Sequence, residues 1–236
     1  MKKMLKIKRF TLIEMLVVLS IIGIMLSISL PAFSRLMAGQ GVSGGARELG
    51  GMLSMTRAYA IGNNCYAAVI IPGGTGSTAF SGSSSTKLNF CAYRPCVVTP
   101  KYSGGVIQPN QWNFASWVDE TKWSVLPSGV VVTNTSDGID NVVTNGDTIT
   151  VSGETSTSKN FFKDLLDETV SDITFNAVVF RPSGIPSTSS SAAGIYYVRA
   201  GTPNGTSVIE TDPNHKNNYK LTINQYTGRL KYEQGQ

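Results

Sequence analysis

The stretch that decides the fold is FTLIEMLVVLSIIGIMLSISLPAF, residues 10–33. It contains one charged residue, Glu14, and otherwise only apolar and small residues. A helix that crosses a bilayer needs about 20 predominantly apolar residues, so this stretch predicts a transmembrane helix. Five basic residues precede it, namely Lys2, Lys3, Lys6, Lys8 and Arg9. By the positive-inside rule, they predict a cytoplasmic N-terminus and an extracytoplasmic domain after the helix.

Three other interpretations of this stretch fit less well. A cleaved signal peptide has a shorter, uncharged apolar core and a small-x-small site, whereas Leu36-Met37-Ala38 places a large residue at the −3 position. A lipoprotein signal needs a Cys soon after the apolar run, and the first Cys is Cys65. A plain anchor leaves Glu14 unexplained, because an ionisable group inside an apolar span is costly and indicates function.

The basic leader followed by Phe10-Thr11-Leu12-Ile13-Glu14 and an apolar run resembles the N-terminus of type IV pilin-like proteins. Gly23 and Pro31 fall where many members of that family have Gly and Pro. The resemblance covers about a tenth of the chain. It implies cleavage by a prepilin peptidase between Arg9 and Phe10, and methylation of the new α-amino group of Phe10.

The resemblance also implies a role for Glu14. In that family, the apolar helices pack into a filament core, and the Glu of one subunit faces the N-terminus of its neighbour. One departure concerns processing. The family usually has Gly before the cut, whereas this chain has Arg9.

The helical pattern is predicted to continue past Pro31, with a kink at the proline because it removes a backbone donor. From Arg47 to Ile61, apolar residues again recur at three- and four-residue steps. Gly39–Gly45 is a weak helix former, and Gly62-Asn63-Asn64 is a plausible stop. The segment 34–61 is therefore expected to be an amphipathic continuation that packs on the domain that follows.

The rest of the chain is rich in β-branched and aromatic residues between turn residues, a pattern typical of strands. The predicted strands are Tyr66–Ile71, Trp123–Leu126, Gly129–Thr133, Asp147–Val151, Ile173–Arg181, Ile195–Arg199, Tyr219–Asn224 and Arg229–Glu233. A short helix is predicted at Asn160–Glu168, and surface loops at Pro72–Lys87 and Ser183–Gly194.

These elements predict an α+β fold, in which a long N-terminal helix with a membrane-spanning first half packs on an antiparallel sheet. The expected domains are a leader at 1–9, an assembly helix at 10–33, its continuation at 34–61 and a globular domain at 62–236. Arg57-Ala58-Tyr59-Ala60, Arg181-Pro182-Ser183-Gly184 and Gly228-Arg229-Leu230 make the chain similar to minor pseudopilins of the GspH/FimT type. That family occurs in type II secretion and type IV pilus systems.

The net charge of +5 does not by itself indicate nucleic-acid binding. Five of the 20 basic residues lie within residues 1–9, which leaves 15 bases against 15 acids from Phe10 onward. A local patch remains possible at Gly228-Arg229-Leu230-Lys231, which is close to the Gly-Arg-x-Arg pattern of DNA-binding FimT-like pilins. Arg229 and Lys231 are two apart on a predicted strand, so their side chains share one face. Lys216, Lys220 and Arg199 are candidates to extend it.

Three cysteines allow two interpretations. Cys91 and Cys96 in CAYRPC could form a disulfide in an oxidising compartment, or all three thiols could be free and inert. Asp137, Asp140 and Asp147 offer oxygens for Ca²⁺ but do not match an EF-hand loop, so no metal is predicted. No cofactor is predicted either. With one His and neither a nucleophile motif nor a P-loop, the chain is predicted not to be an enzyme.

The resemblance to pilin-like proteins implies two possible functions, which are stated here as expectations. The first is a pilin or pseudopilin subunit, held in the inner membrane with a periplasmic domain, that joins a filament of other pilin subunits and supports protein secretion. Its other expected partners are the prepilin peptidase and inner-membrane lipid. The alternative is a minor pilin that binds DNA for uptake through Arg229 and Lys231.

Overall fold

The computed structural model describes residues 12–73, 88–133, 147–151, 173–187, 194–204, 207–211 and 217–235; within the helix, the side chains of 28–39 are not described. Clustering of contacts divides the chain into two compact units, Met1–Gly39 and Gln40–Gln236. The predicted short helix at Asn160–Glu168, and residues 74–87 of the predicted loop Pro72–Lys87, lie outside the described residues.

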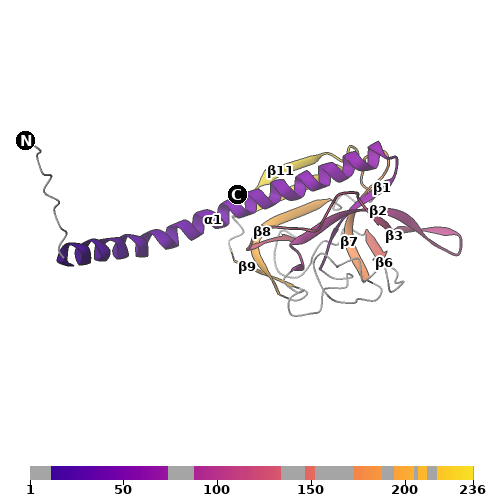
Figure 1. Ribbon diagram of the computed structural model, residues 1–236. Coiled ribbons are helices and arrows are strands. Elements are labelled where there is room, and N and C mark those ends of the chain that lie inside the picture. Colours follow the sequence, from indigo (N-terminus) through magenta and orange to yellow (C-terminus); the bar gives the residue numbers. More distant parts are fainter. Residues whose placement is uncertain are drawn as a thin grey trace, which may run out of the picture. The chain divides into compact units, whose positions relative to one another are not determined.

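One helix and eleven strands make up the described structure (Figure 1). They are α1 (Leu12–Gly62), β1 (Tyr66–Ile71), β2 (Ala92–Ser103), β3 (Val106–Trp117), β4 (Ser124–Val125), β5 (Val130–Thr133), β6 (Thr148–Val151), β7 (Ile173–Phe180), β8 (Ile195–Asn204), β9 (Ser207–Glu210), β10 (Asn218–Ile223) and β11 (Leu230–Gln234). The helix continues through Pro31 and through the glycines of 39–45.

Five strands form a closed ring in the order β1-β7-β6-β3-β2, because β2 also pairs with β1. Neighbouring strands cannot alternate in direction all the way around a ring with an odd number of members. One pair must be parallel, and it is β3–β6, through Gln111–Asn113 and Thr148–Thr150. The other four pairings of the ring are antiparallel. The short strand β4 is attached to β2 outside the ring.

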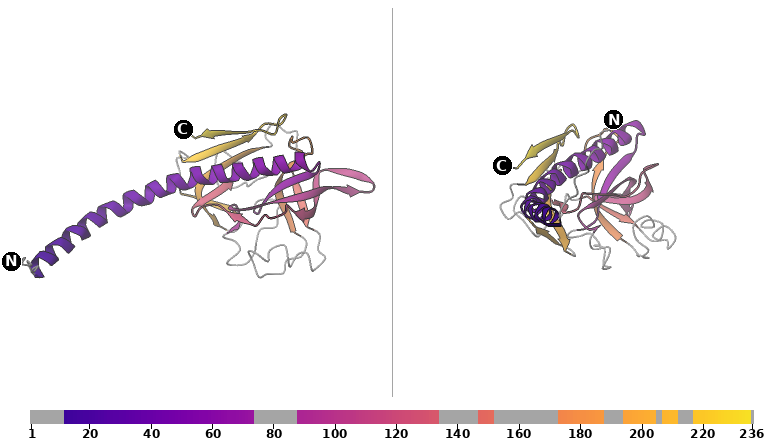
Figure 2. Two further views of the ribbon diagram at one scale, coloured as in Figure 1. Left: turned by 45° about the horizontal axis from the view of Figure 1, so that its top comes forward. Right: turned by 60° about the vertical axis from the view of Figure 1, so that its left-hand side comes forward.

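A second sheet has the order β11-β10-β8-β5, with β9 paired to the far end of β8. Residues Gln40–Gly62 of α1 lie along the globular unit with this sheet and β1 close by (Figure 2). The first hydrophobic core joins the helix side chains Val42, Leu49 and Leu53 to residues of β1, β5, β7, β8 and β10. Each fully buried Leu contributes roughly 1.5–3 kcal/mol, so this face holds the helix on the unit.

Helix glycines allow this close packing. A Cβ at Gly45 would lie 3.1 Å from Val130 Cγ1, and one at Gly50 would collide with the ring of Tyr232. Glycines that weaken a helix in isolation therefore serve here to admit side chains of the second sheet. This explains why the segment 39–45, predicted from its composition to be weak helix, is helical.

Strand β1 belongs to both cores. Ala67, Val69 and Ile71 point into the first core, while Ala68 and Ile70 point into a second core inside the ring. That core also contains Trp112, Ile149 and Phe175, among others. Burial on both faces explains why β1 reads as the unbroken apolar run YAAVII and not as an alternating pattern.

The predicted fold class is wrong in two respects. The globular unit is not one antiparallel sheet, but a five-stranded ring with one parallel pair beside a second sheet. Among the described residues, no helical segment combines the length and the apolar content that crossing a membrane requires.

This second finding contradicts two further predictions. They are the single-pass inner-membrane localisation and the assignment of a transmembrane protein.

Candidate functional site

The predicted assembly site lies at the start of α1. Arg9 and Phe10, the predicted cleavage and methylation positions, lie outside the described residues. Glu14 is exposed and occupies the first turn of the helix. A carboxylate there interacts favourably with the helix dipole, an effect of about 0.3–1 kcal/mol. Glu14 thus has a local stabilising effect in addition to any role between subunits.

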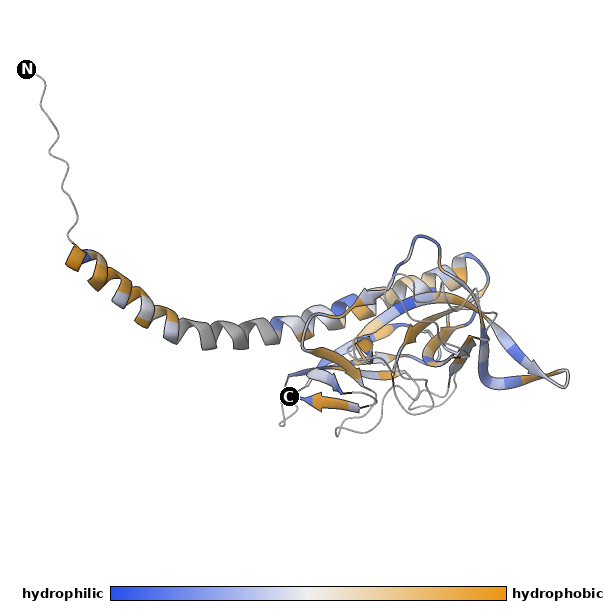
Figure 3. Cartoon of the chain, turned by 60° about the horizontal axis from the view of Figure 1, so that its bottom comes forward, coloured by the Kyte–Doolittle hydropathy of each residue, from blue (hydrophilic) through white to orange (hydrophobic). Residues whose placement is uncertain are grey.

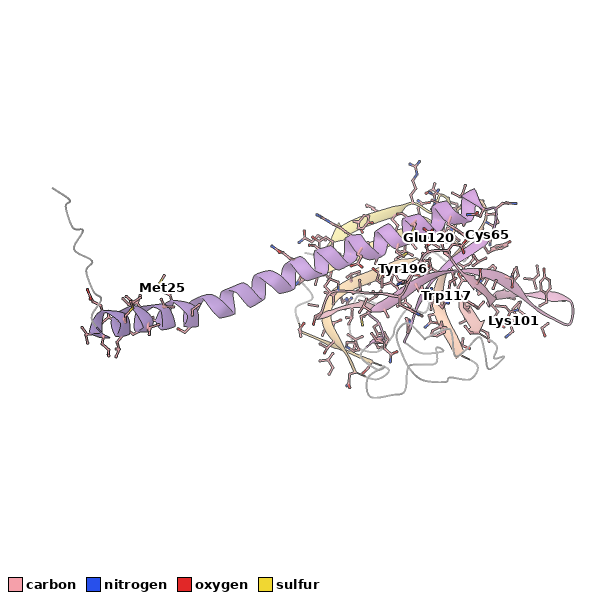
Figure 4. The ribbon with its side chains drawn as sticks, viewed as in Figure 1. Met25, Cys65, Lys101, Trp117, Glu120 and Tyr196 are labelled. Carbon is pink, nitrogen blue, oxygen red and sulfur yellow. The ribbon has the colours of Figure 1, made fainter. Side chains whose placement is uncertain are left out.

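The helix around Glu14 consists mostly of apolar residues, coloured orange in Figure 3, and their side chains are exposed. Twelve large apolar residues between Leu12 and Leu26 have exposed fractions between 46% for Ile22 and 83% for Leu12. Met25, labelled in Figure 4, is one of them. Ser20 and Ser27 donate their hydroxyls to the carbonyls of Val17 and Ile24, each at 2.7 Å. Because these hydroxyls bond within the helix, the polar residues do not break the apolar surface.

Neither Cys91 nor Cys96 forms a disulfide. Cys91 packs in the first core and Cys96 in the second, on opposite faces of the chain that enters β2. Five extended residues span about 16 Å, whereas the Cα atoms of a disulfide lie within about 7 Å. The proposed disulfide is therefore not formed, and the alternative of free thiols holds. Burial raises the pKa of the Cys91 thiol to about 11, which makes this thiol a poor nucleophile.

The candidate DNA-binding residues lie on the closing hairpin of β10 and β11. Arg229 immediately precedes β11, and Lys231 lies within it; both are exposed. Glu233, two residues further on, forms an ion pair with Lys231, with 2.7 Å between Nζ and Oε1. Its Oε2 also lies 3.7 Å from Nζ of Lys220 on β10. Lys231 holds the pKa of the Glu233 carboxyl below its ordinary value. A carboxylate at the centre of this face offsets the positive charge that phosphate binding requires.

Arg199 does not extend this patch. Arg199 is buried and forms an ion pair with Glu210. Its guanidinium also lies 4.9 Å from the ring centroid of Tyr197. Lys216 lies outside the described residues.

Two motifs far apart in the sequence meet at the end of α1. Arg57 Nε donates to the carbonyl of Gly184 at 3.0 Å. Gly228 adjoins the same place, because a Cβ on it would lie 2.8 Å from Arg57 Nε and would collide with the Gly184 carbonyl oxygen. Gly228 also has a φ of +65°, in the left-handed region that Gly adopts far more readily than Ala. The three residues fix the turn of the closing hairpin to the helix.

We expect Gly228→Ala to destabilise the globular unit by about 2 kcal/mol or more, from backbone strain plus the collision with Gly184. Gly104→Ala is the matched control, since Gly104 has a φ of +60° but open space where the Cβ would lie. Urea unfolding of the full chain measures both variants. Equal losses would show that the backbone conformation alone matters and that the contact with Gly184 contributes nothing.

A buried carboxylate, Asp147, lies immediately before β6 of the ring. Asp147 is 2% exposed, and its Oδ1 accepts from Trp112 Nε1 at 2.9 Å. Its Oδ2 accepts from the hydroxyl of Ser187, whose carbonyl in turn accepts from Arg181 Nη2 at 2.8 Å. Burial raises the pKa of this carboxyl, although its donors and the nearby Arg181 lower it.

Sequence reasoning considered Asp147 only as an oxygen donor for Ca²⁺, together with Asp137 and Asp140. Those two residues lie outside the described part of the chain. Within that part, no group of three or more candidate ligand residues is placed to hold a metal ion. The side chain of Asp147 is surrounded by hydrogen-bond donors and links β3 to the segment after β7. The Arg181-Pro182-Ser183-Gly184 motif that leads to Ser187 was the only sequence signal for this cluster.

Comparisons of the chain with protein-family models, with curated proteins and with solved structures found no match.

Proposed function

We propose that this chain is a subunit of a helix-cored filament of the type IV pilin kind, in a type II secretion or pilus system. The observation that carries the proposal is the exposed apolar surface that α1 presents between Leu12 and Leu26. A helix that is apolar all round needs burial on every side. Packing against the same helix of other copies supplies it without any further partner.

Two further observations support the proposal. The acid of the first turn, Glu14, follows a basic leader and the sequence Phe10-Thr11-Leu12-Ile13, the arrangement of the pilin-like N-terminus. The same helix continues into a globular unit of its own, where Val42 to Ala60 supply one face of a buried core. One element thus offers an assembly surface in its first half and an attachment to the globular unit in its second half.

The role proposed for Glu14 is to pair with the α-amino group of a neighbouring subunit that begins at Phe10. We expect Glu14→Ala to leave the cellular amount of the chain unchanged but to remove it from filaments sheared off the cells. Glu14→Asp is the control, because it keeps the charge that favours the helix N-terminus with a shorter reach. Immunoblots of whole cells and of the sheared fraction measure both variants.

Normal recovery of Glu14→Ala in the sheared fraction would show that Glu14 serves only its own helix. Loss of Glu14→Ala with partial recovery of Glu14→Asp supports pairing between subunits. The fold of the globular unit is not at issue in this test, because Glu14 belongs to the unit Met1–Gly39 and contributes to neither core.

A further inference from the structure

The hairpin of β2 and β3 continues beyond the rest of the ring as a two-stranded ribbon (Figures 1 and 2). We name residues 99–110 the β2–β3 arm. Its tip is the turn Gly104-Gly105, with φ values of +60° and +80°. Strand β1 pairs with β2 only as far as Val98, and β6 pairs with β3 only from Gln111 onward. The arm therefore extends past the sheet pairings of both of its strands.

The tip of the arm exposes large apolar side chains. Tyr102, Val106 and Ile107 are 61%, 65% and 54% exposed. Tyr102 lies directly opposite Ile107 in the ladder, so these two side chains share one face, while Val106 lies opposite Ser103 on the other. An isolated two-stranded hairpin is only marginally stable in water. Apolar residues at such a tip are explained by a partner that covers them.

The partner packs against side chains and does not add a strand. Pro100 on β2 and Pro109 on β3 each lack the backbone N–H that a new neighbouring strand requires. The chemistry of the tip is an aromatic–aliphatic pair beside Lys101, and no acid occurs in the sequence from 99 to 118. Tyr is one of the residues enriched among those that dominate protein–protein contacts.

The size of the tip indicates which protein is bound. The surface that three side chains can bury is far smaller than the roughly 1,000 Å² or more that a stable complex between freely diffusing proteins needs. A contact this small forms only between molecules that a second contact already holds together, because that second contact raises their effective concentration. Copies gathered through residues 12–26 of α1 meet that condition, because each helix is covalently continuous with its globular unit.

We propose that the β2–β3 arm packs its Tyr102–Ile107 face against the globular unit of a second copy of this chain within the assembly. The inference rests on the proposed function, because it needs copies already brought together by the helix. The arm then serves as a secondary contact that sets how neighbouring globular units meet.

The test uses the full chain, carrying a photo-activated cross-linking residue in place of Tyr102 or Ile107. The control position is Tyr226, which is 77% exposed and lies in the turn between β10 and β11. Two differently tagged copies are mixed during assembly, and products that carry both tags are quantified. We expect a yield from positions 102 and 107 at least tenfold above that from 226, and its loss when Leu16→Glu/Leu19→Glu is added to both copies.

Other outcomes overturn the inference in distinguishable ways. If the wild-type chain assembles but positions 102 and 107 give no more double-tagged product than 226, the arm inference fails and the proposed function stands. The same holds if cells yield only cross-links to a different protein. If double-tagged product persists in the helix variant, the arm binds without help from the helix. If the wild-type chain does not assemble, both proposals fail.

Discussion

The double variant Leu16→Glu/Leu19→Glu is expected to sediment as a monomer under conditions in which the wild-type chain sediments as large assemblies. Leu16 and Leu19 are 57% and 68% exposed and lie three residues apart, on the same side of α1. Their burial between copies contributes roughly 3–6 kcal/mol in total. Each introduced carboxylate adds several kcal/mol of desolvation cost. Since 1.4 kcal/mol is tenfold in affinity, self-association weakens by more than a hundredfold.

Leu16→Met/Leu19→Met is the matched control, because it conserves apolar volume and helix propensity and should assemble like the wild type. Velocity sedimentation of the purified full chain over a concentration series separates the three proteins. Thermal unfolding of the globular unit should be the same in all of them, since residues 16 and 19 contribute to neither core. Wild-type sedimentation of the Glu variant would disprove assembly through this surface.

Asp147→Ala is expected to destabilise the globular unit by about 3 kcal/mol or more. The change leaves the indole N–H of Trp112 and the hydroxyl of Ser187 without their acceptor inside the ring. Each buried polar group without a partner costs about 1–3 kcal/mol, and the cavity adds to that. Asp119→Ala is the control, because Asp119 is an exposed acid whose removal should change stability by less than about 0.5 kcal/mol. Urea unfolding at neutral pH measures the difference.

The contribution of Asp147 to the free energy of unfolding is expected to increase as pH falls. Burial raises the pKa of the Asp147 carboxyl above its unfolded value of about 3.9. A carboxyl with a raised pKa binds its proton more tightly in the folded protein. Its contribution to stability is therefore largest below the unfolded pKa and is lost as pH rises through the folded pKa.

We expect the stability gap between the wild type and Asp147→Asn to shift in favour of the wild type as pH falls from neutral through that raised pKa. Urea unfolding of both proteins over the acid range measures the gap, and the other carboxyls cancel in the comparison. A gap that moves the opposite way would show that the hydrogen bonds from Trp112 and Ser187 outweigh burial.

Several strands were predictable because they carry dense β-branched and aromatic residues between turn residues. Strand β1 was predicted at its observed bounds, Tyr66–Ile71, and β5, β7 and β10 within a residue or two of theirs. The two longest strands, β2 and β3, were missed. They contain Pro95, Pro100 and Pro109 and many polar residues, which argue against strands in a local pattern. Pairing with each other and with β1 overrides that local preference.

The sequence by itself determined the continuous apolar surface of residues 12–26 and the acid at Glu14, because these depend only on the order of side chains along one helix. Tertiary structure decided the ring with its one parallel pair and the free thiols of Cys91 and Cys96. It also decided the burial of Asp147 and the contact of Gly228 with Arg57 and Gly184. Each of these depends on which distant segments lie side by side. The hydrophobic periodicity of a segment does not predict its distant neighbours, because it shows only which face of the element is apolar and not which segment covers that face.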